Sequence, residues 1–264
     1  MDGKQIIKRI VHSIIWLGIL TWMTVIMGFV SGAKKEVLCQ EIAIDISDSL
    51  DIKFVTTGMI REVLAGSGIN TQGNPVEAIQ TRELEFLIEQ NPYVANAEVH
   101  VNIDGLLKVS IDQRKPLMRV MPGGKGGYYI DQDGYKLPLS DTYSPMVLLF
   151  TGRLEFEEFQ GESSATMVDT TKQEISNLMA FARYVQSSDF WNQQIVQIYR
   201  NRSAEYELIP RVGAHQIFLG TLENYRTKLR NLKLLYEQGF SAYGWNTYDK
   251  INLSYSNQII CTKR

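Results

Sequence analysis

The chain of 264 residues has room for one membrane anchor and one or two ordinary domains. Its apolar content of 44% and charged content of 21% are those of a globular protein, which excludes wholesale disorder. Without the first 33 residues it holds 24 basic and 28 acidic side chains (27 − 3 and 29 − 1), a net charge of −4. Nucleic-acid-binding proteins normally carry the opposite bias, so we expect no nucleic-acid partner.

Residues 10–30 form an apolar run without Asp, Glu, Lys or Arg. As a helix, at about 1.5 Å per residue, this run would be about 30 Å long, the thickness of the hydrocarbon core of a bilayer. A buried core helix is the alternative, but helices of globular proteins are rarely apolar on every face over such a length. The sequence therefore predicts a single transmembrane helix over 10–30, preceded by a cytoplasmic tail over 1–9.

Two features bear on the fate and orientation of this helix. Three basic residues precede the run and two follow it, which predicts an N-terminus in the cytoplasm: Lys4, Lys8 and Arg9 against Lys34 and Lys35. Small residues at 31–33 resemble a signal-peptidase site, yet the apolar run exceeds the ~7–15 residues usual in a cleaved signal. We therefore expect an uncleaved anchor with most of the chain outside the cytoplasm.

Residues 37–115 predict a compact unit in the order strand, helix, helix, strand, strand. Residues 41–46 alternate polar and apolar, as a half-buried strand does. One helix is expected from about Thr57 to Gly66, and a second from about Thr81 to Asn91, where Pro92 follows.

The last two strands of this unit predict a hairpin around Asp104-Gly105. A two-residue turn would put the apolar rows of the two strands on opposite faces. An odd-numbered loop, such as residues 102–106, pairs Val101 with Leu107 and restores one buried face, and a bulge would do the same.

Residues 116–264 predict a second α+β module, in which packed helices cover a mainly antiparallel sheet. Asp133-Gly134 indicates a hairpin, and residues 155–170 a solvent-exposed loop. Helical stripes run over 175–185 and 222–235, and strands are expected at 195–199, 205–209, 216–219, 251–255 and 258–262.

The order of elements after the N-terminal helix resembles a POTRA domain, and the chain as a whole resembles the cell-division family FtsQ/DivIB. The segments that carry the resemblance are Asn91–Val94, Ala97–Ile103, Gln113–Pro116, Gly127–Pro138, Leu149–Gly152, Glu207–Gly213 and Lys250–Asn257. Residues 153–170 and the short tail depart from the family pattern.

The resemblance implies a non-enzymatic, single-pass scaffold in the inner membrane at the division septum. Its expected partners are FtsB-like and FtsL-like division proteins, with no cofactor and no small-molecule substrate. The family captures its FtsB-like partner by adding a strand to the edge of the last sheet. Two alternatives stay open: a membrane-anchored wall hydrolase with an unrecognised site, and a transport-type POTRA protein.

A search for catalytic chemistry gave no candidate residue. The sequence lacks G-x-S-x-G, H-E-x-x-H and P-loop motifs, and its three histidines are scattered, which predicts no metal site. The glycines of 123–127 are expected to serve a hairpin connection, and the carboxylates Asp131, Asp133, Glu155, Glu157 and Glu158 to be solvated. We expect Cys39 and Cys261 to be buried free thiols.

The C-terminal strand is the expected partner site. It is the last strand of the sequence, so we expect it at a sheet edge, although it could instead be internal and complete the fold. Alternation puts Ile259 and Cys261 on one face and Gln258 and Ile260 on the other, and a proline at Ile260 is expected to remove one backbone donor and misshape the edge. Three further side chains are candidates for this site: the aromatic Tyr255 and the basic Arg226 and Arg230.

Overall fold

The computed structural model describes residues 3–34, 37–47, 51–68, 73–122, 126–153, 166–169, 173–240, 244–245, 247–255 and 258–264. In the first helix it describes side chains over 12–29 only. Several sequence-based expectations fall outside these residues: most of the 155–170 loop with Glu155, Glu157 and Glu158, the stretch from Gly123 to Lys125, and the turn at Ser256-Asn257. The chain divides into two compact units, which are described separately below.

The N-terminal helix α1 runs from Gly3 to Lys34, four residues further than expected toward the soluble part. Residues 12–29 have a mean hydropathy of 1.6, and no part of this stretch is buried. By length and composition α1 can cross a membrane, as the sequence predicts.

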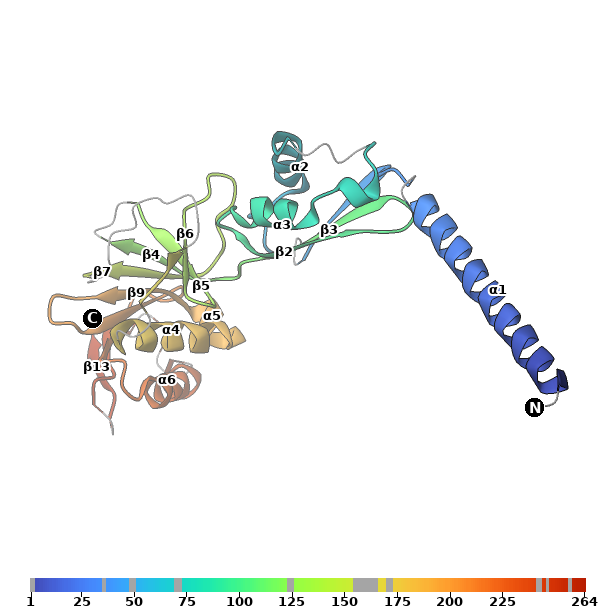
Figure 1. Cartoon of the computed structure of the whole chain (residues 1–264). Coiled ribbons are helices and arrows are strands. Elements are labelled where there is room, and N and C mark those ends of the chain that lie inside the picture. Colours follow the sequence, from blue (N-terminus) through green and yellow to red (C-terminus); the bar gives the residue numbers. More distant parts are fainter. Residues whose placement is uncertain are drawn as a thin grey trace. The chain divides into compact units, whose positions relative to one another are not determined.

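The POTRA-like part of the first unit has the element order that the sequence predicts (Figure 1). It contains β1 (Glu41–Ile46), α2 (Thr57–Gly66), a short 3-10 helix η1 (Val76–Ala78), α3 (Thr81–Glu89), β2 (Val94–Val101) and β3 (Leu106–Gln113). The sheet order is β1-β3-β2, with β1 parallel to β3. Helices α2 and α3 contribute buried Ile60, Leu64, Leu84 and Ile88.

The β2–β3 hairpin has an odd-numbered loop, as predicted. The N–H of Asn102 donates to the carbonyl of Leu106 at 2.9 Å, so the loop is residues 103–105. Gly105 adopts φ +87, and a Cβ there would lie 2.3 Å from the carbonyl oxygen of Leu38. Only glycine fits this turn, because the backbone of residues 37–38 passes directly beside it.

The second unit is built on a ten-stranded sheet of order β13-β12-β11-β10-β9-β7-β4-β5-β6-β8. Its strands are β4 (Pro116–Pro122), β5 (Tyr128–Asp131), β6 (Tyr135–Leu137), β7 (Leu148–Gly152), β8 (Thr166–Met167), β9 (Ile195–Arg200), β10 (Tyr206–Pro210), β11 (Gln216–Gly220), β12 (Tyr248–Asn252) and β13 (Ile260–Lys263). Its helices are α4 (Gln173–Gln186), α5 (Asp189–Gln194), α6 (Tyr225–Leu234) and a π-helix η2 (Leu235–Phe240).

This sheet is mixed, although most of its pairs are antiparallel as expected. The pairs β4–β7, β7–β9 and β11–β12 are parallel.

The strand expected at 251–255 runs instead from Tyr248 to Asn252. It ends there because the side chain of Asn252 accepts a hydrogen bond from the N–H of Ser254 at 2.8 Å, which turns the chain out of the sheet.

Helices α4, α5 and α6 lie on one side of the ten-stranded sheet (Figure 1). Phe150, Leu208, Phe181 and Leu232 are fully buried in the core between helices and sheet. The edge-on contact of Phe181 with Tyr225, at 5.3 Å between ring centroids, joins α4 to α6.

Residues 48–55 and 90–95 belong to the second unit, although they come from the POTRA-like stretch of sequence. Phe54 is fully buried there, stacked on Tyr93 at 4.6 Å and edge-on to Tyr129 and Tyr143. The buried side chain of Gln113 accepts a hydrogen bond from the N–H of Val55 and donates to the carbonyl of Ile52, both at 2.9 Å. These contacts fix segment 51–55 within the second unit.

Candidate partner-binding edge

Strand β13 lies at one edge of the ten-stranded sheet, as the sequence predicts. The direction of its backbone groups follows from its neighbour. The N–H of Leu253 donates to the carbonyl of Phe218, which lies in β11, so alternation turns the backbone groups of Asn252 toward β13. Asn252 pairs with Ile260 in the antiparallel register, so the backbone groups of Ile260 point inward to β12.

Thr262 alternates with Ile260 and also points inward. The open edge is therefore formed by the backbone groups of Cys261 and Lys263. The N–H of Arg264 agrees with this alternation, because it donates inward to the carbonyl of Thr247 at 3.2 Å. A proline at Ile260 would therefore remove a backbone donor, as expected, but this donor belongs to the ladder with β12 and not to the open edge. The outward donors are the backbone N–H groups of Cys261 and Lys263.

The side chains of this segment alternate as predicted. Ile259 and Cys261 are half-buried and pack against the core, whereas Gln258 is exposed and Ile260 is 43% exposed. Tyr255, just after β12, is 52% exposed. Cys261 is a free thiol, as expected, but only half-buried, whereas Cys39 is free and buried.

An open groove of about 560 Å³ lies beside β13. It is lined from the helical side by Asn231, Leu234, Leu235, Gln238 and Gly239, and from the strand side by Gln258 and Ile259. Most of the helical lining belongs to the end of α6 and to the π-helix η2. Short π-helical segments are rare and occur often at functional sites. The groove gives an incoming segment apolar contacts next to the row of outward donors.

A buried aromatic cluster lies behind the groove. The imidazole Nε2 of His215 is 2.8 Å from the hydroxyl of Tyr236, and both rings contact Phe240. Burial lowers the pKa of His215, with a further contribution from the guanidinium of Arg264. The same guanidinium donates to the carbonyl of Ala214 at 3.0 Å. His215 is thus a neutral residue of the core.

The two predicted basic residues are exposed on α6, outside the lining of the groove. The guanidinium of Arg226 lies over the rings of Tyr184 and Tyr225, at 5.6 and 5.8 Å from their centroids. The neighbouring Lys228 is structural, since its ammonium donates to the carbonyls of Leu219 and Thr221, and burial lowers its pKa.

The POTRA-like sheet also has an edge, at β2, but two of its backbone donors are occupied. The N–H of Val99 donates to a carboxylate oxygen of Glu85 at 2.8 Å, and the N–H of Ala97 to one of Glu89 at 3.2 Å. Both glutamates lie on α3. This arrangement blocks strand addition at β2, as natural sheet edges commonly do.

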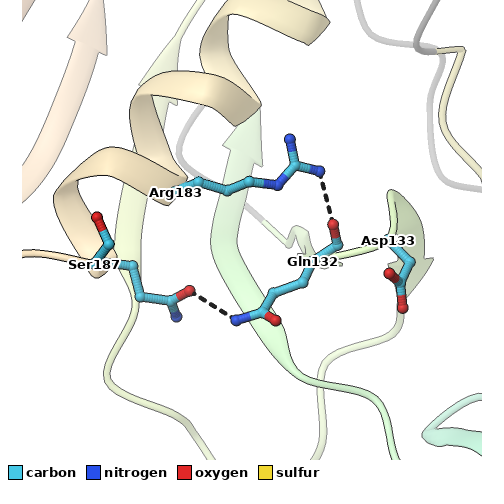
Figure 2. A pocket seen from close by; sticks show the side chains of 5 residues that line it. Gln132, Asp133, Arg183 and Ser187 are labelled. Carbon is cyan, nitrogen blue, oxygen red and sulfur yellow. Dashed lines mark hydrogen bonds between the residues drawn. The ribbon is translucent and has the colours of Figure 1, made fainter.

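A second hollow, of about 500 Å³, is polar and lies between the β5–β6 turn and the end of α4 (Figure 2). Arg183 donates to the carbonyl of Gln132 at 2.7 Å, and the Gln132 amide donates to Gln186 at 3.1 Å. These side chains satisfy one another, which indicates a structural role. Asp131 nearby is fully buried and paired with Arg114 at 3.1 Å, with burial raising its pKa, so it is not solvated as expected.

No cluster of three or more metal-binding side chains occurs within the residues that the structure describes. His100, in the POTRA-like part, lies beside Glu98 at 3.5 Å on an exposed strand face. An exposed pair of this kind is no catalytic arrangement, since nothing excludes water or fixes its geometry.

Comparison with known families assigns both parts of the chain. Residues 37–112 match the POTRA-like domain, and residues 115–262 match the family model described as FtsQ/DivIB, C-terminal related. The chain belongs to the FtsQ/DivIB family. A search of curated proteins gave no match.

FtsQ/DivIB proteins are non-enzymatic division proteins, which agrees with the expected cell-division scaffold. The helix α1 adds the single membrane span that such a protein would use. The C-terminal match places residues 115–262 in this family, which argues against the transport-type POTRA alternative.

Sequence reasoning found the segment 258–261 but missed the helical lining of the groove. The available signal was Leu234, an apolar residue next to the inward stripe that ends at Leu235. In a regular helix Leu234 is simply an exposed leucine. Its place in a groove depends on the π-helix that follows, which nothing in the local pattern indicates.

Proposed function

We propose that this FtsQ/DivIB protein is a bitopic scaffold that links septal cell-wall synthesis proteins through its extracytoplasmic units. Its N-terminus lies in the cytoplasm, its two folded units lie outside, and it acts at the division septum. Its partners are FtsB-like and FtsL-like division proteins, and the FtsB-like partner adds a strand to β13.

The observation that carries this proposal is the contrast between two sheet edges. Two donors of β2 are taken by Glu85 and Glu89, whereas β13 presents the N–H groups of Cys261 and Lys263 beside a groove with both apolar and amide side chains. Strand addition needs free main-chain donors for affinity and neighbouring pockets for selectivity. Ile260 and Tyr255 are exposed apolar contacts at this edge, and Lys263 and Arg264 discourage unspecific pairing.

The decisive experiment is Cys261→Pro in the full-length protein, co-purified from membranes with its FtsB-like partner. Proline removes the outward donor and is tolerated where that N–H faces solvent, so the Tm should change little. We expect partner recovery to fall at least tenfold, while the matched Cys261→Ser variant binds as the natural protein does. Full binding by a folded Cys261→Pro protein would place the partner site elsewhere.

A side-chain variant tests the groove separately from the strand. Leu234→Asp puts a charge at a position that is 46% exposed, so the fold should be retained. We expect weaker recovery of the FtsB-like partner. Arg226→Ala and Arg230→Ala test whether the basic face of α6 contributes, with a salt-dependent loss as the expected result.

Orientation is tested by a reporter that works only in the cytoplasm. Fused after Arg264, it should be inactive, and fused before Met1 it should be active. The reverse pattern would contradict the proposed topology.

A further inference from the structure

We propose that the tip of the β2–β3 hairpin docks onto the bilayer that α1 spans, with Ile103 inserted among the lipids. Ile103 is 88% exposed, the highest value among the large apolar side chains in the described part of the chain. Single exposed apolar residues are normal on protein surfaces, so exposure alone does not carry the proposal. The position of this residue relative to the anchor does.

The hairpin loop is fixed to the segment that leaves the anchor. The N–H of Gln40 donates to the carbonyl of Gly105 at 3.0 Å, and the N–H of Val76 donates to the carbonyl of Val37 at 2.9 Å. A Cβ on Gly105 would meet both the carbonyl of Leu38 and the side chain of Val37. The loop therefore cannot move away from residues 37–40 without breaking the fold.

The short connection between α1 and Val37 then keeps the loop near the membrane. Helix α1 ends at Lys34, three residues before Val37, and an extended chain of that length reaches about 11 Å. Ile103 lies two residues from Gly105, within about 7 Å. Ile103 is thus confined to roughly 25 Å from the end of the anchor, for every orientation that the link permits.

The end of the anchor itself lies at the membrane surface. The apolar window ends at Phe29, and α1 continues for five residues to Lys34, about 7.5 Å along the helix. This is about the depth of one headgroup layer. Because the link keeps the loop beside the membrane, the effective concentration of the loop at the lipid surface is high. The insertion of one apolar side chain therefore needs only a small intrinsic affinity for lipid.

A second exposed apolar residue supports the lipid surface as the occupant. Leu38, beside Gly105, is 45% exposed, so the anchor-proximal end of this unit presents two aliphatic side chains. Asp104, next to Ile103, is exposed and acidic, which gives no attraction to anionic lipid. The docking is therefore apolar, and it should not depend on the anionic lipid content.

The test uses the full-length protein in vesicles of phosphatidylethanolamine and phosphatidylglycerol, with and without brominated acyl chains. An environment-sensitive fluorophore is attached at Ile103→Cys in a Cys261→Ser background, where burial shields Cys39. Leu20→Cys, inside the span, is the positive control. Asp112→Cys is the negative control, because it lies on the same unit, exposed, seven residues along β3 from Gly105.

We expect brominated lipid to quench the labels at residues 20 and 103 and to leave the label at 112 unchanged. Quenching at 103 should be the same in vesicles with low and high phosphatidylglycerol. A label at 103 that behaves like the label at 112 overturns the proposal, as does a label at 20 that is not quenched, since α1 is then no anchor. Neither result bears on strand addition at β13, which the Cys261→Pro experiment tests separately.

Discussion

The carboxylate of Glu85 on α3 accepts a hydrogen bond from the backbone N–H of Val99 on β2 at 2.8 Å. A second pair, Glu89 with Ala97, repeats the arrangement two residues along the strand. Two side chains thus take the place that a neighbouring strand would occupy. Within the part of the chain that the structure describes, two donors at the β2 edge are occupied, whereas no strand pairs with the outer side of β13.

The first prediction concerns this closed edge. In the double variant Glu85→Ala/Glu89→Ala, the N–H groups of Val99 and Ala97 lose their acceptors. The edge of β2 then becomes free to pair with a strand of another molecule. We expect self-association of the protein in detergent, measured by analytical ultracentrifugation. Glu62→Ala, on the exposed face of α2, is the control and should stay unchanged. A double variant that remains as monodisperse as the natural protein would show that the glutamates do not protect the edge.

The second prediction concerns Gln113, whose side chain joins Val55 and Ile52. Gln113→Ala leaves the buried N–H of Val55 without this partner, at about 1–3 kcal/mol, and also removes the bond to the partly buried carbonyl of Ile52. We expect faster amide hydrogen exchange over residues 51–55 and a lower Tm. Gln132→Ala removes an exposed hydrogen bond to Gln186 instead, and it should change the free energy of unfolding by less than about 0.5 kcal/mol. Unchanged exchange at Val55 in Gln113→Ala would contradict this account.

Sequence patterns predicted the order of the elements well, because they report burial on one face of an element. The odd-numbered hairpin loop is an example, since without a bulge that parity is needed to put Val101 and Leu107 on one face. The direction of strands relative to their neighbours was harder to predict from the sequence. Residues 148–152 have the pattern of an apolar strand, but nothing in them indicates that both neighbours of β7 are parallel to it. Contacts between distant residues were inaccessible too, such as Glu85 with Val99. The direction of the amide of Ile260 was inaccessible as well, because it depends on the register with β12.

The third prediction concerns pH and His215. Its pKa is lowered in the folded protein by burial and by Arg264, while the unfolded chain keeps an ordinary value near 6.5. Above this value both states are neutral and stability is unaffected. Below it the unfolded state takes up the proton first, so stability falls as pH falls, with a slope of at most about 1.4 kcal/mol per pH unit.

The measurement is the Tm of the natural protein and of His215→Leu between pH 7.5 and 5. The variant cannot titrate at this position, so its Tm should decline less over that interval, although its absolute Tm is lower because Tyr236 loses a partner. Parallel Tm curves for the two proteins would mean that His215 takes up its proton equally well in the folded state.

The fourth prediction concerns Gly152, the last residue of β7 and of the family-like segment Leu149–Gly152. Its φ is +103, and a Cβ there would lie 2.2 Å from the carbonyl oxygen of Arg200, its partner on β9. The obstacle is backbone, so it cannot rotate away as a side chain could. The unfavourable φ alone costs about 1–3 kcal/mol, and displacing β9 in the middle of the ten-stranded sheet adds to it.

We therefore expect Gly152→Ala to lower the free energy of unfolding by more than about 2 kcal/mol and to reduce the amount of folded protein in membranes. The matched control is Gly66→Ala at the end of α2, where a Cβ meets nothing within 4 Å. Alanine is the better helix former there, so this change should be neutral or stabilise by up to about 1 kcal/mol. Calorimetry on both variants separates the two effects, because each changes one glycine to the same residue. A Gly152→Ala protein that melts like Gly66→Ala would show that β7 and β9 can separate at this point without loss, and the glycine would then need another explanation.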